Sequence, residues 1–563
     1  MSLRPLIIIL LFLFQRASAQ EFKFLVQFRD KNNNGFSIQD PSVYLSEKSI
    51  QRRLKQHIPI EITDLPLTAA YVDSLAALPS LRILNKSRWF NQVFISIPDS
   101  SVLQQIRQFS FVLSTEPVNN SRSKKITGHV SINQHTGFSA RTETTTSVSS
   151  LSKEENYGAS FSQVHIHNGE YLHDQGFHGE GMTIAILDNG FNNYLFNPAF
   201  DSIRNDHRIL GTYDFVNQKA SVNEEEVHGA YCFSIIASNI PGILIGTAPA
   251  ASYWLFKTED DFSETPVEEQ NWVAAAEFAD SAGVDLITTS LGYSYFDDSV
   301  YNLNYPERNG HYSLVSRAAN LAVARGIIVT ASAGNSGGQT EEKNFVLCPS
   351  DGDSVYAVGA VDSRGQIAFF SSWGPNGSGQ IKPDGVSFGS GTFFIGPDGN
   401  LTSGSGTSYA NPNLAGLITC LWQAFPEFNA HDILSAVRQS SDLYIHPDDH
   451  YGYGLPDFEK AWQILFQKRY AILNPLTDKE WIHVFPVPFH ESIQIFFQPP
   501  LTGTAVIQLL DISGKLLETQ SVYTIAGQQQ LLKFKTQPSL TSGMYFIRYS
   551  DQKKSKTVKT LKY

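Results

Sequence analysis

A serine stands where a loop meets an apolar helix, in the run from Gly406 to Gly416, which reads G-T-S-Y-A-N-P-N-L-A-G. Pro412 is tolerated in the first turn of a helix, because the first backbone N–H groups there have no intrahelical partner. The pattern predicts that Ser408 lies beside these free N–H groups and the positive end of the helix dipole. Such a position stabilises an oxyanion, although Ser and Thr are also common as ordinary helix caps.

An aspartate and a histidine also stand at the ends of predicted elements. Met182–Leu187 reads as a short buried strand that leads into Asp188, and His228 opens the apolar stretch Ala230–Ala237. A carboxylate at the carboxyl end of a central parallel strand lies at the edge where active sites form in open α/β sheets. Taken singly, Asp188 is also typical of a turn and His228 of a solvated helix start.

Two further buried strands end in small and polar residues. One is Val284–Thr289 and the other is Ile327–Ala331. Parallel strands bring their carboxyl ends to one edge, so we expect the residues that follow them to lie near Asp188. The residues after the two strands are Ser290, Leu291 and Gly292, and Ala333, Gly334 and Asn335, respectively.

The order Asp, His, Asn, Ser resembles that of the subtilisin-like serine peptidases, or subtilases. The matching text is I-A-I-L-D-N-G, V-H-G-A-Y, T-T-S-L-G-Y, T-A-S-A-G-N-S-G and the run around Ser408. The resemblance covers roughly Tyr157 to Leu465. It implies an α/β fold with a doubly wound, mostly parallel sheet, in agreement with the alternation of strands and helices in this region.

The resemblance also implies a role for each residue. Ser408 would be the nucleophile and His228 the general base and then the acid, while Asp188 would orient the imidazole. The side-chain amide of Asn335 and the backbone N–H of Ser408 would form the oxyanion hole. An extended protein or peptide substrate would lie between Ser290-Leu291-Gly292 and Ala333-Gly334. No cofactor is required for this chemistry, and no metal is expected at these residues.

Two departures from the family pattern keep a second interpretation open. The usual H-G-T-H is H-G-A-Y here, which places Tyr231 after Ala230, and Tyr409 replaces the usual Met of G-T-S-M-A. Neither change removes a reacting atom, but a catalytically inactive surface-binding protein on a subtilase scaffold stays an alternative. An α/β-hydrolase esterase is excluded, because Ala410 stands where G-x-S-x-G requires glycine and the partners precede the serine.

Composition limits the class of protein. The 563 residues predict several domains, and the net charge of −12 argues against nucleic acid as the main partner. Cys232, Cys348 and Cys420 are too few for a disulfide framework, and Cys232 and Cys420 fall in apolar helical runs that favour buried thiols. One disulfide stays open in an exported protein.

The N-terminus has the pattern of a secretory signal peptide over residues 1–19. Arg4 precedes the apolar run Leu6–Phe14, and Ala17-Ser18-Ala19 is a small-x-small cleavage signature. The apolar run is too short to span a membrane, and no other stretch is long enough. We therefore expect a mature protein without a membrane span that is secreted or displayed at the cell surface.

Residues 20–118 predict an α+β domain that resembles the propeptides of secreted subtilases, which would make the chain's own propeptide a partner of its cleft. Ser46 is expected to cap a helix, and Trp89–Ile97 alternates like a strand. Residues 119–156 are rich in Ser and Thr, which is typical of an exposed linker. The peptidase domain would follow over residues 157–467.

The C-terminal residues predict a second linker over 468–487 and a small β-sandwich over 488–563. The text F-P-V-P-F, D-I-S-G-K and S-G-M-Y-F-I-R resembles the sorting domains of the type IX secretion system, which implies a secretion apparatus as partner. Structural calcium could bind in the loop Tyr295–Gly310, through carboxylates such as Asp297 and Asp298, although a solvated loop is the more ordinary interpretation.

Overall fold

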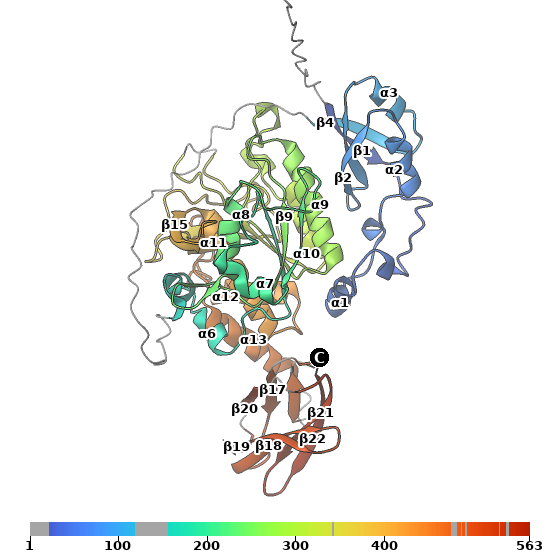
Figure 1. The fold of residues 1–563 in the computed structure, drawn as a ribbon. Coiled ribbons are helices and arrows are strands. Elements are labelled where there is room, and N and C mark those ends of the chain that lie inside the picture. Colours follow the sequence, from blue (N-terminus) through green and yellow to red (C-terminus); the bar gives the residue numbers. More distant parts are fainter. Residues whose placement is uncertain are drawn as a thin grey trace, which may run out of the picture. The chain divides into compact units, whose positions relative to one another are not determined.

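The computed structural model describes residues 22–118, 156–339, 343–473 and 481–562, with gaps at 486, 490–491, 528–529 and 536–539 (Figure 1). The predicted signal peptide and nearly all of the first predicted linker lie outside the described residues. Two compact units make up the chain, residues 1–461 and 462–563.

The first unit begins with an α+β domain on a four-stranded antiparallel sheet. Its strands lie in the order β2-β3-β1-β4. Ser46 caps its first helix as predicted, because its hydroxyl accepts the N–H of Ser49. The elements are β1 Phe22–Phe28, α1 Glu47–Lys55, α2 Ala69–Ala76, β2 Arg82–Ser87, β3 Gln92–Ile97, α3 Val102–Ile106 and β4 Val112–Val118.

Strand β3 is buried on both faces. The odd-numbered residues of Val93–Ile97 pack in the core of the N-terminal domain. On the other face of the sheet, Gln92 Nε2 donates to Gln270 Oε1 of α9 (Pro266–Ala282) in the next domain at 3.2 Å. The second face of this sheet is therefore an interface between two domains, which strand alternation alone does not predict.

A seven-stranded sheet forms the centre of the next domain, in the order β13-β12-β11-β10-β5-β9-β6. All neighbouring strands are parallel, and β5, β10, β11, β12 and β13 are buried throughout, as continuous apolar runs predict. The bounds are β5 Thr183–Asp188, β6 Ile209–Asp214, β9 Ser252–Lys257, β10 Leu286–Thr289, β11 Ile328–Ser332, β12 Tyr356–Val361 and β13 Gly385–Phe388.

Helices cover both faces of this sheet, which confirms the α/β doubly wound prediction. Figure 1 shows α8 and α11 on one side and α9 and α10 on the other. Helix α9 is bounded by strong local signals: a Thr265–Glu268 capping box at its start and Gly283, at φ +82°, at its end. The other elements are α5 Phe161–His165, α6 Glu170–Asp174, α7 Asp201–Asn205, α8 His228–Ala237, β7 Asn239–Ile240, β8 Leu244–Ile245, α10 Leu314–Ala324, β14 Ser390–Ile395, β15 Leu401–Ser405, α11 Thr407–Ala424, α12 Ala430–Ser440 and α13 Phe458–Leu473.

The winding of the sheet reverses beside β5. Strands β6 and β9 lie on one side of β5, whereas β10 to β13 lie on the other. Connections on opposite faces leave a crevice at the carboxyl ends of the two strands where the reversal occurs, and ligands bind there in open α/β sheets. Asp188 is the last residue of β5 and Ser290 directly follows β10, so both lie at this switch point.

Helix α11 begins earlier than the sequence predicts. It starts at Thr407, so Ser408 lies within its first turn and Pro412 lies inside the helix instead of in the first turn. Proline has no N–H, so the carbonyl oxygen of Ser408, four residues earlier, receives no helical hydrogen bond from it. That carbonyl is left to accept hydrogen bonds from other elements.

The second unit is a sandwich of two antiparallel sheets, β16-β17-β20 and β19-β18-β21-β22. Apolar residues of both sheets, such as Ile495, Phe534 and Ile547, form one buried core, as predicted for a small β-sandwich. The bounds are β16 Ile482–Phe485, β17 Ser492–Phe497, β18 Gly503–Asp511, β19 Leu516–Thr524, β20 Gln530–Lys535, β21 Gly543–Ser550 and β22 Ser555–Lys562.

The described residues bear on two expectations, the absence of a membrane span and the state of the three cysteines. Within the described ranges, no helix combines the length and the apolar character needed to cross a bilayer. Cys232, Cys348 and Cys420 all lie in the described part, where each is a free, buried thiol, so the disulfide that the sequence left open is not formed.

Candidate active site

Asp188 and His228 form a hydrogen-bonded pair at the switch point. Asp188 is fully buried and accepts the Nδ1–H of His228 on Oδ1 at 2.7 Å, together with the backbone N–H of Asn189 at 2.8 Å. A Cβ at Gly229 would lie 2.4 Å from the carbonyl oxygen of Gly190 and 3.0 Å from the Cβ of Asp188. The residue after His228 must therefore be glycine for the start of α8 to approach the end of β5 so closely.

The carboxylate controls the proton affinity of the imidazole. Burial by itself lowers the pKa of His228, but the charge of Asp188 and its hydrogen bond outweigh that effect and raise the pKa well above the ordinary histidine value. The pair therefore stabilises an imidazolium. With Nδ1 bound to the carboxylate, Nε2 is the ring nitrogen that can exchange a proton with a substrate or a nucleophile.

Ser408 is joined to β10 by a reciprocal pair of hydrogen bonds. Its Oγ donates to the carbonyl oxygen of Ser290 at 3.2 Å, and the Oγ of Ser290 donates to the carbonyl oxygen of Ser408 at 2.8 Å. The second bond uses the carbonyl that Pro412 leaves without its helical partner. Serine and proline at this spacing therefore attach the start of α11 to the end of β10.

Cys232 links the histidine helix to the serine helix, a contact that sequence reasoning missed. Its Sγ lies 3.4 Å from the carbonyl oxygen of Ser408 and 4.0 Å from Nδ1 of His228. Burial raises the pKa of the Cys232 thiol, so it stays protonated and can donate to that carbonyl. The sequence did contain a pattern that could have predicted this contact. Cys232 follows His228 by four residues on one helix, which places both side chains on the same face.

Asn335 is oriented by the residue before the serine. Its Oδ1 accepts the backbone N–H of Thr407 at 2.9 Å and the Oγ1–H of the same residue at 3.0 Å. Because the oxygen is directed at these two donors, the amide nitrogen is directed away from them. Asn335 is exposed, so this nitrogen can donate to a group in solution.

The two substituted family positions lie together in space. The rings of Tyr231 and Tyr409 both pack at a tilt against Phe394 of β14, with ring centroids 4.5 Å and 4.7 Å from that of Phe394, respectively. The Tyr409 ring also lies 5.9 Å from the His228 ring. The two tyrosines are therefore parts of one aromatic cluster that packs beside the imidazole, and they leave its bond to Asp188 intact.

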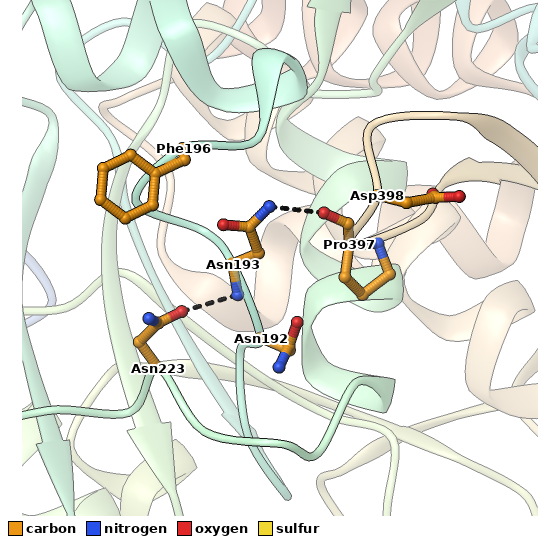
Figure 2. A pocket seen from close by; sticks show the side chains of 6 residues that line it. All are labelled: Asn192, Asn193, Phe196, Asn223, Pro397 and Asp398. Carbon is orange, nitrogen blue, oxygen red and sulfur yellow. Dashed lines mark hydrogen bonds between the residues drawn. The ribbon is translucent and has the colours of Figure 1, made fainter.

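A hollow adjoins the loops that hold the Asp–His pair (Figure 2). The Nδ2 of Asn193 donates to the carbonyl of Pro397, and its backbone N–H donates to Oδ1 of Asn223. The chain that leaves β5 is thereby tied to the chain that enters α8, which helps to keep the two catalytic candidates in register. The hollow is lined by Asn192, Asn193, Phe196, Asn223, Pro397 and Asp398.

The predicted substrate-binding segments follow neighbouring parallel strands. Thr289 of β10 lies opposite Ala331 of β11, so Ser290-Leu291-Gly292 and Ala333-Gly334 leave the sheet side by side. The N–H of Gly334 is held by Oγ1 of Thr407 at 3.2 Å. Ser290 is buried and its hydroxyl is engaged with Ser408, so it braces the serine helix.

The carboxylates considered for calcium serve local structure. Asp298 accepts the N–H of Val300 as the cap of a short helical turn, and Asp297 accepts the N–H of Glu264. Glu259, Glu264 and Glu268 bring their oxygens within 4.8 Å of one another. Glu268 is, however, already bonded to backbone N–H groups of Asp260 and Thr265. These contacts fit a structural role for both sets of carboxylates.

Family models match three parts of the chain. A model described as the subtilase family, Peptidase S8, matches residues 179–454. A Peptidase S8 propeptide domain of Bacteroidota matches residues 23–131, and a secretion system C-terminal sorting domain matches residues 483–562. These matches confirm the predicted resemblance to a subtilase with a propeptide and a type IX sorting domain.

Individual relatives agree with the family models. Subtilisin DY of Bacillus licheniformis is 30% identical over 291 residues, which are 51% of this chain and 93% of that protein. Subtilisin E of Bacillus subtilis strain 168 is 30% identical over 296 residues, 52% of this chain and 68% of that protein. The crystal structure of the epidermin leader peptide processing serine protease from Staphylococcus aureus has a TM-score of 0.52 at 15% identity, over 79% of this chain and 99% of that one; at this identity the likeness concerns the fold alone.

The sorting domain and the subtilisin relatives indicate a protein that is secreted or carried to the cell surface. The propeptide domain indicates that it is made as a precursor. The chain therefore belongs to the subtilase family and is a subtilisin-like serine endopeptidase.

Proposed function

We propose that this endopeptidase hydrolyses peptide bonds through an acyl-enzyme on Ser408, with His228 as proton carrier and Asp188 as its orienting carboxylate. The observation that carries the proposal is the Asp188–His228 hydrogen bond at the switch point of the sheet. Ser408 adjoins this pair through Cys232, whose sulfur approaches both His228 and the Ser408 carbonyl. Protein groups and water are sufficient for this chemistry.

The first half of the reaction begins when the Ser408 hydroxyl turns from the carbonyl of Ser290 towards Nε2 of His228, by a change of its χ1 rotamer. Its oxygen attacks the substrate carbonyl as the imidazole takes the proton. The resulting imidazolium is the form that Asp188 stabilises. His228 then gives the proton to the leaving amine, and the acyl group stays on Ser408 as an ester.

The second half repeats these steps with water as the nucleophile. His228 takes a proton from the water, which attacks the ester, and Ser408 leaves with the proton that His228 returns. In both halves the oxyanion would be bound by the Nδ2 of Asn335 and the backbone N–H of Ser408. The orientation of the Asn335 oxygen toward Thr407 supports this role, and loss of such a donor costs about 10²–10³-fold in rate in a subtilisin.

Substrate recognition would follow the strand-addition mode. An extended peptide would lie between Ser290-Leu291-Gly292 and Ala333-Gly334, with main-chain hydrogen bonds for affinity and side-chain pockets for specificity. The chain's own propeptide would occupy the cleft until it is cut off, at a position between about Thr115 and Asn156. The secretion apparatus would recognise residues 488–563, after a signal peptide over residues 1–19 has directed export.

The Ser408→Ala variant tests the nucleophile. We expect it to lose protein hydrolysis, to stay unprocessed and to fail to react with a fluorophosphonate probe, because no hydroxyl is left to form the bond. Ser290→Ala is the matched control, since it removes a neighbouring hydroxyl and should still react with the probe. Labelling of Ser408→Ala at the normal rate would contradict the proposal, and an unreactive natural chain would favour the inactive surface-binding protein.

A further inference from the structure

The slot between Gly292 and Gly334 has two walls made of backbone. Gly292 follows β10 and Gly334 follows β11, and these strands are adjacent and parallel. Neither residue has a side chain, so a substrate backbone can approach both walls closely. In the proposed function this slot receives the substrate side chain next to the cleaved bond, because it lies between the two segments that hold the peptide.

Leu347 already fills part of this slot. A Cβ built on Gly292 would lie 2.7 Å from Cδ1 of Leu347, and one built on Gly334 would lie 2.8 Å from its Cγ. Atoms of one leucine side chain therefore take the space that side chains from both walls would otherwise need. A single residue that meets both walls must lie between them.

The backbone at Leu347 is attached to both walls. The N–H of Leu347 donates to the carbonyl of Ala333 at 3.1 Å, and the N–H of Tyr293 donates to the carbonyl of Cys348 at 2.7 Å. The carbonyl of Leu347 also accepts the N–H of Asp351 at 3.1 Å. With these bonds on successive residues, the segment bridges the two walls and cannot easily withdraw its side chain.

Leu347 is only half-buried, whereas its neighbours Val346 and Cys348 are completely buried. The leucine side chain thus retains contact with solvent although it lies between two walls of the domain. This combination identifies it as the floor of an open slot. A substrate side chain that enters between the two glycine walls must therefore share this space with Leu347.

We propose that Leu347 is the specificity-determining residue of this slot and restricts cleavage to peptides with a small residue, Gly, Ala or Ser, before the cleaved bond. The inference rests on the proposed function, since it assigns a substrate class to the same cleft. An aromatic or long aliphatic side chain would have to displace the leucine, whose backbone is held by both walls. Overfilling a packed site in this way is unfavourable.

The test compares two chromogenic peptide anilides that differ only in Ala or Phe before the cleaved bond, using the full-length protein after it has processed itself. We expect kcat/KM to favour Ala by at least about tenfold in the natural chain, because a methylene in an apolar pocket is worth about 10–200-fold. The Leu347→Ala variant deepens the slot, so the Ala-to-Phe ratio should fall by at least about tenfold.

Val346→Ala is the matched control. It truncates the adjacent buried residue, whereas the atoms nearest to a Cβ on either glycine wall belong to Leu347 and Ser372, so it should leave the ratio unchanged. A protein-library digest by the natural chain, with the cut positions mapped by mass spectrometry, gives an answer even where Leu347→Ala does not fold. Enrichment of Gly, Ala and Ser before the cuts supports the proposal, and enrichment of aromatic or long aliphatic residues overturns it.

The outcomes separate the two proposals. Cleavage of both peptides with the same ratio before and after Leu347→Ala overturns the specificity proposal and leaves the catalytic one standing. Failure of the natural chain both to cut any protein in the library digest and to react with the fluorophosphonate probe overturns the catalytic proposal, and the specificity proposal with it.

Discussion

The candidate active site and the propeptide interface both bury charge, but in opposite ways. At the active site one carboxylate, Asp188, meets one imidazole, and the remaining contacts come from neutral hydroxyl, thiol and amide groups. At the interface the fully buried Asp280 of α9 meets three guanidinium groups of the N-terminal domain. These are Arg52, Arg53 and Arg88, at 2.5, 2.8 and 2.6 Å.

Side chains of the N-terminal domain also donate hydrogen bonds at the C-terminal ends of two helices. Arg52 donates to the carbonyls of Asp280 and Val284, near the end of α9, and to that of Arg325, the residue that directly follows α10. Gln56 donates to the carbonyl of Gly326. A cation at the C-terminus of a helix satisfies free carbonyls and favours the dipole. The propeptide therefore adds hydrogen-bond donors to carbonyl groups at the ends of α9 and α10.

The number of buried charges in each region fits the role of that region. A dense network of buried charges is costly to dehydrate and is stable only with all partners present, which suits a contact that forms during folding and is later broken. A single carboxylate–imidazole pair can instead change its protonation during a reaction. Four predictions test this contrast.

The largest effect is expected from Asp188→Asn. The amide keeps the shape but loses the charge that raises the pKa of His228, and serine proteases with this change lose about 10⁴-fold in kcat. The imidazole must be neutral to take a proton, so activity rises as pH rises through the His228 pKa. In the variant this midpoint should move to lower pH, as measured in a kcat/KM profile of the residual activity; an unmoved midpoint would show that Asp188 does not set it.

The interface should respond most to Asp280→Ala. Removal of one member of a buried ion network costs about 3–5 kcal/mol, because the other charges are left buried without a partner. Hydrogen exchange of the α1 amides in full-length Ser408→Ala should show this loss in the free energy of opening. Lys48→Ala is the control, since its pair with Asp285 at 2.6 Å has a lysine that is 40% exposed and should contribute only about 0–1 kcal/mol. Equal effects of the two variants would refute the distinction.

Acid should release the propeptide. Asp64 of the N-terminal domain pairs with Arg53 and with Arg325 of the next domain, each at 2.8 Å. Burial raises the pKa values of Asp64 and Asp280, but the surrounding guanidinium groups outweigh it and lower both. A carboxyl group whose folded pKa is depressed stabilises the complex above its unfolded pKa, near 3.9, and this contribution is lost as pH falls through the folded value.

The acid release can be followed by exchange of the α1 amides in full-length Ser408→Ala between pH 5 and 3. Asp280→Ala should flatten the profile. Release that sets in well above pH 5 instead would point to other groups.

The smallest effect is expected from Cys232→Ala. It removes the thiol that approaches the Ser408 carbonyl, so kcat should fall by less than about tenfold, as for one weak hydrogen bond. Cys420→Ala is the matched control, because that equally buried thiol donates to the carbonyl of Thr247 at 3.2 Å. Both variants should lose similar stability, but only Cys232→Ala should lower kcat. An equal loss of kcat in both variants would show that Cys232 does not position Ser408.

Much of the fold and part of the site could be predicted from local patterns. Continuous apolar runs predicted β5, β10 and β11, and Ser46 predicted the start of α1. The start of α11 was misplaced, because Pro412 reads as a first-turn residue. Here the tertiary contact of Ser290 with the freed Ser408 carbonyl compensates for a proline inside the helix.

The sequence by itself determined which residue types end the strands and begin the helices, because apolar runs, caps and glycines act within a few neighbouring positions. Only the tertiary structure decided which of these ends meet. The contact of Ser290 with Ser408 spans 118 positions and that of Arg52 with Asp280 spans 228, and Leu347 lies in its slot only because β10 and β11 are neighbours. The order of strands depends on the burial of the whole sheet at once, and no local pattern encodes it.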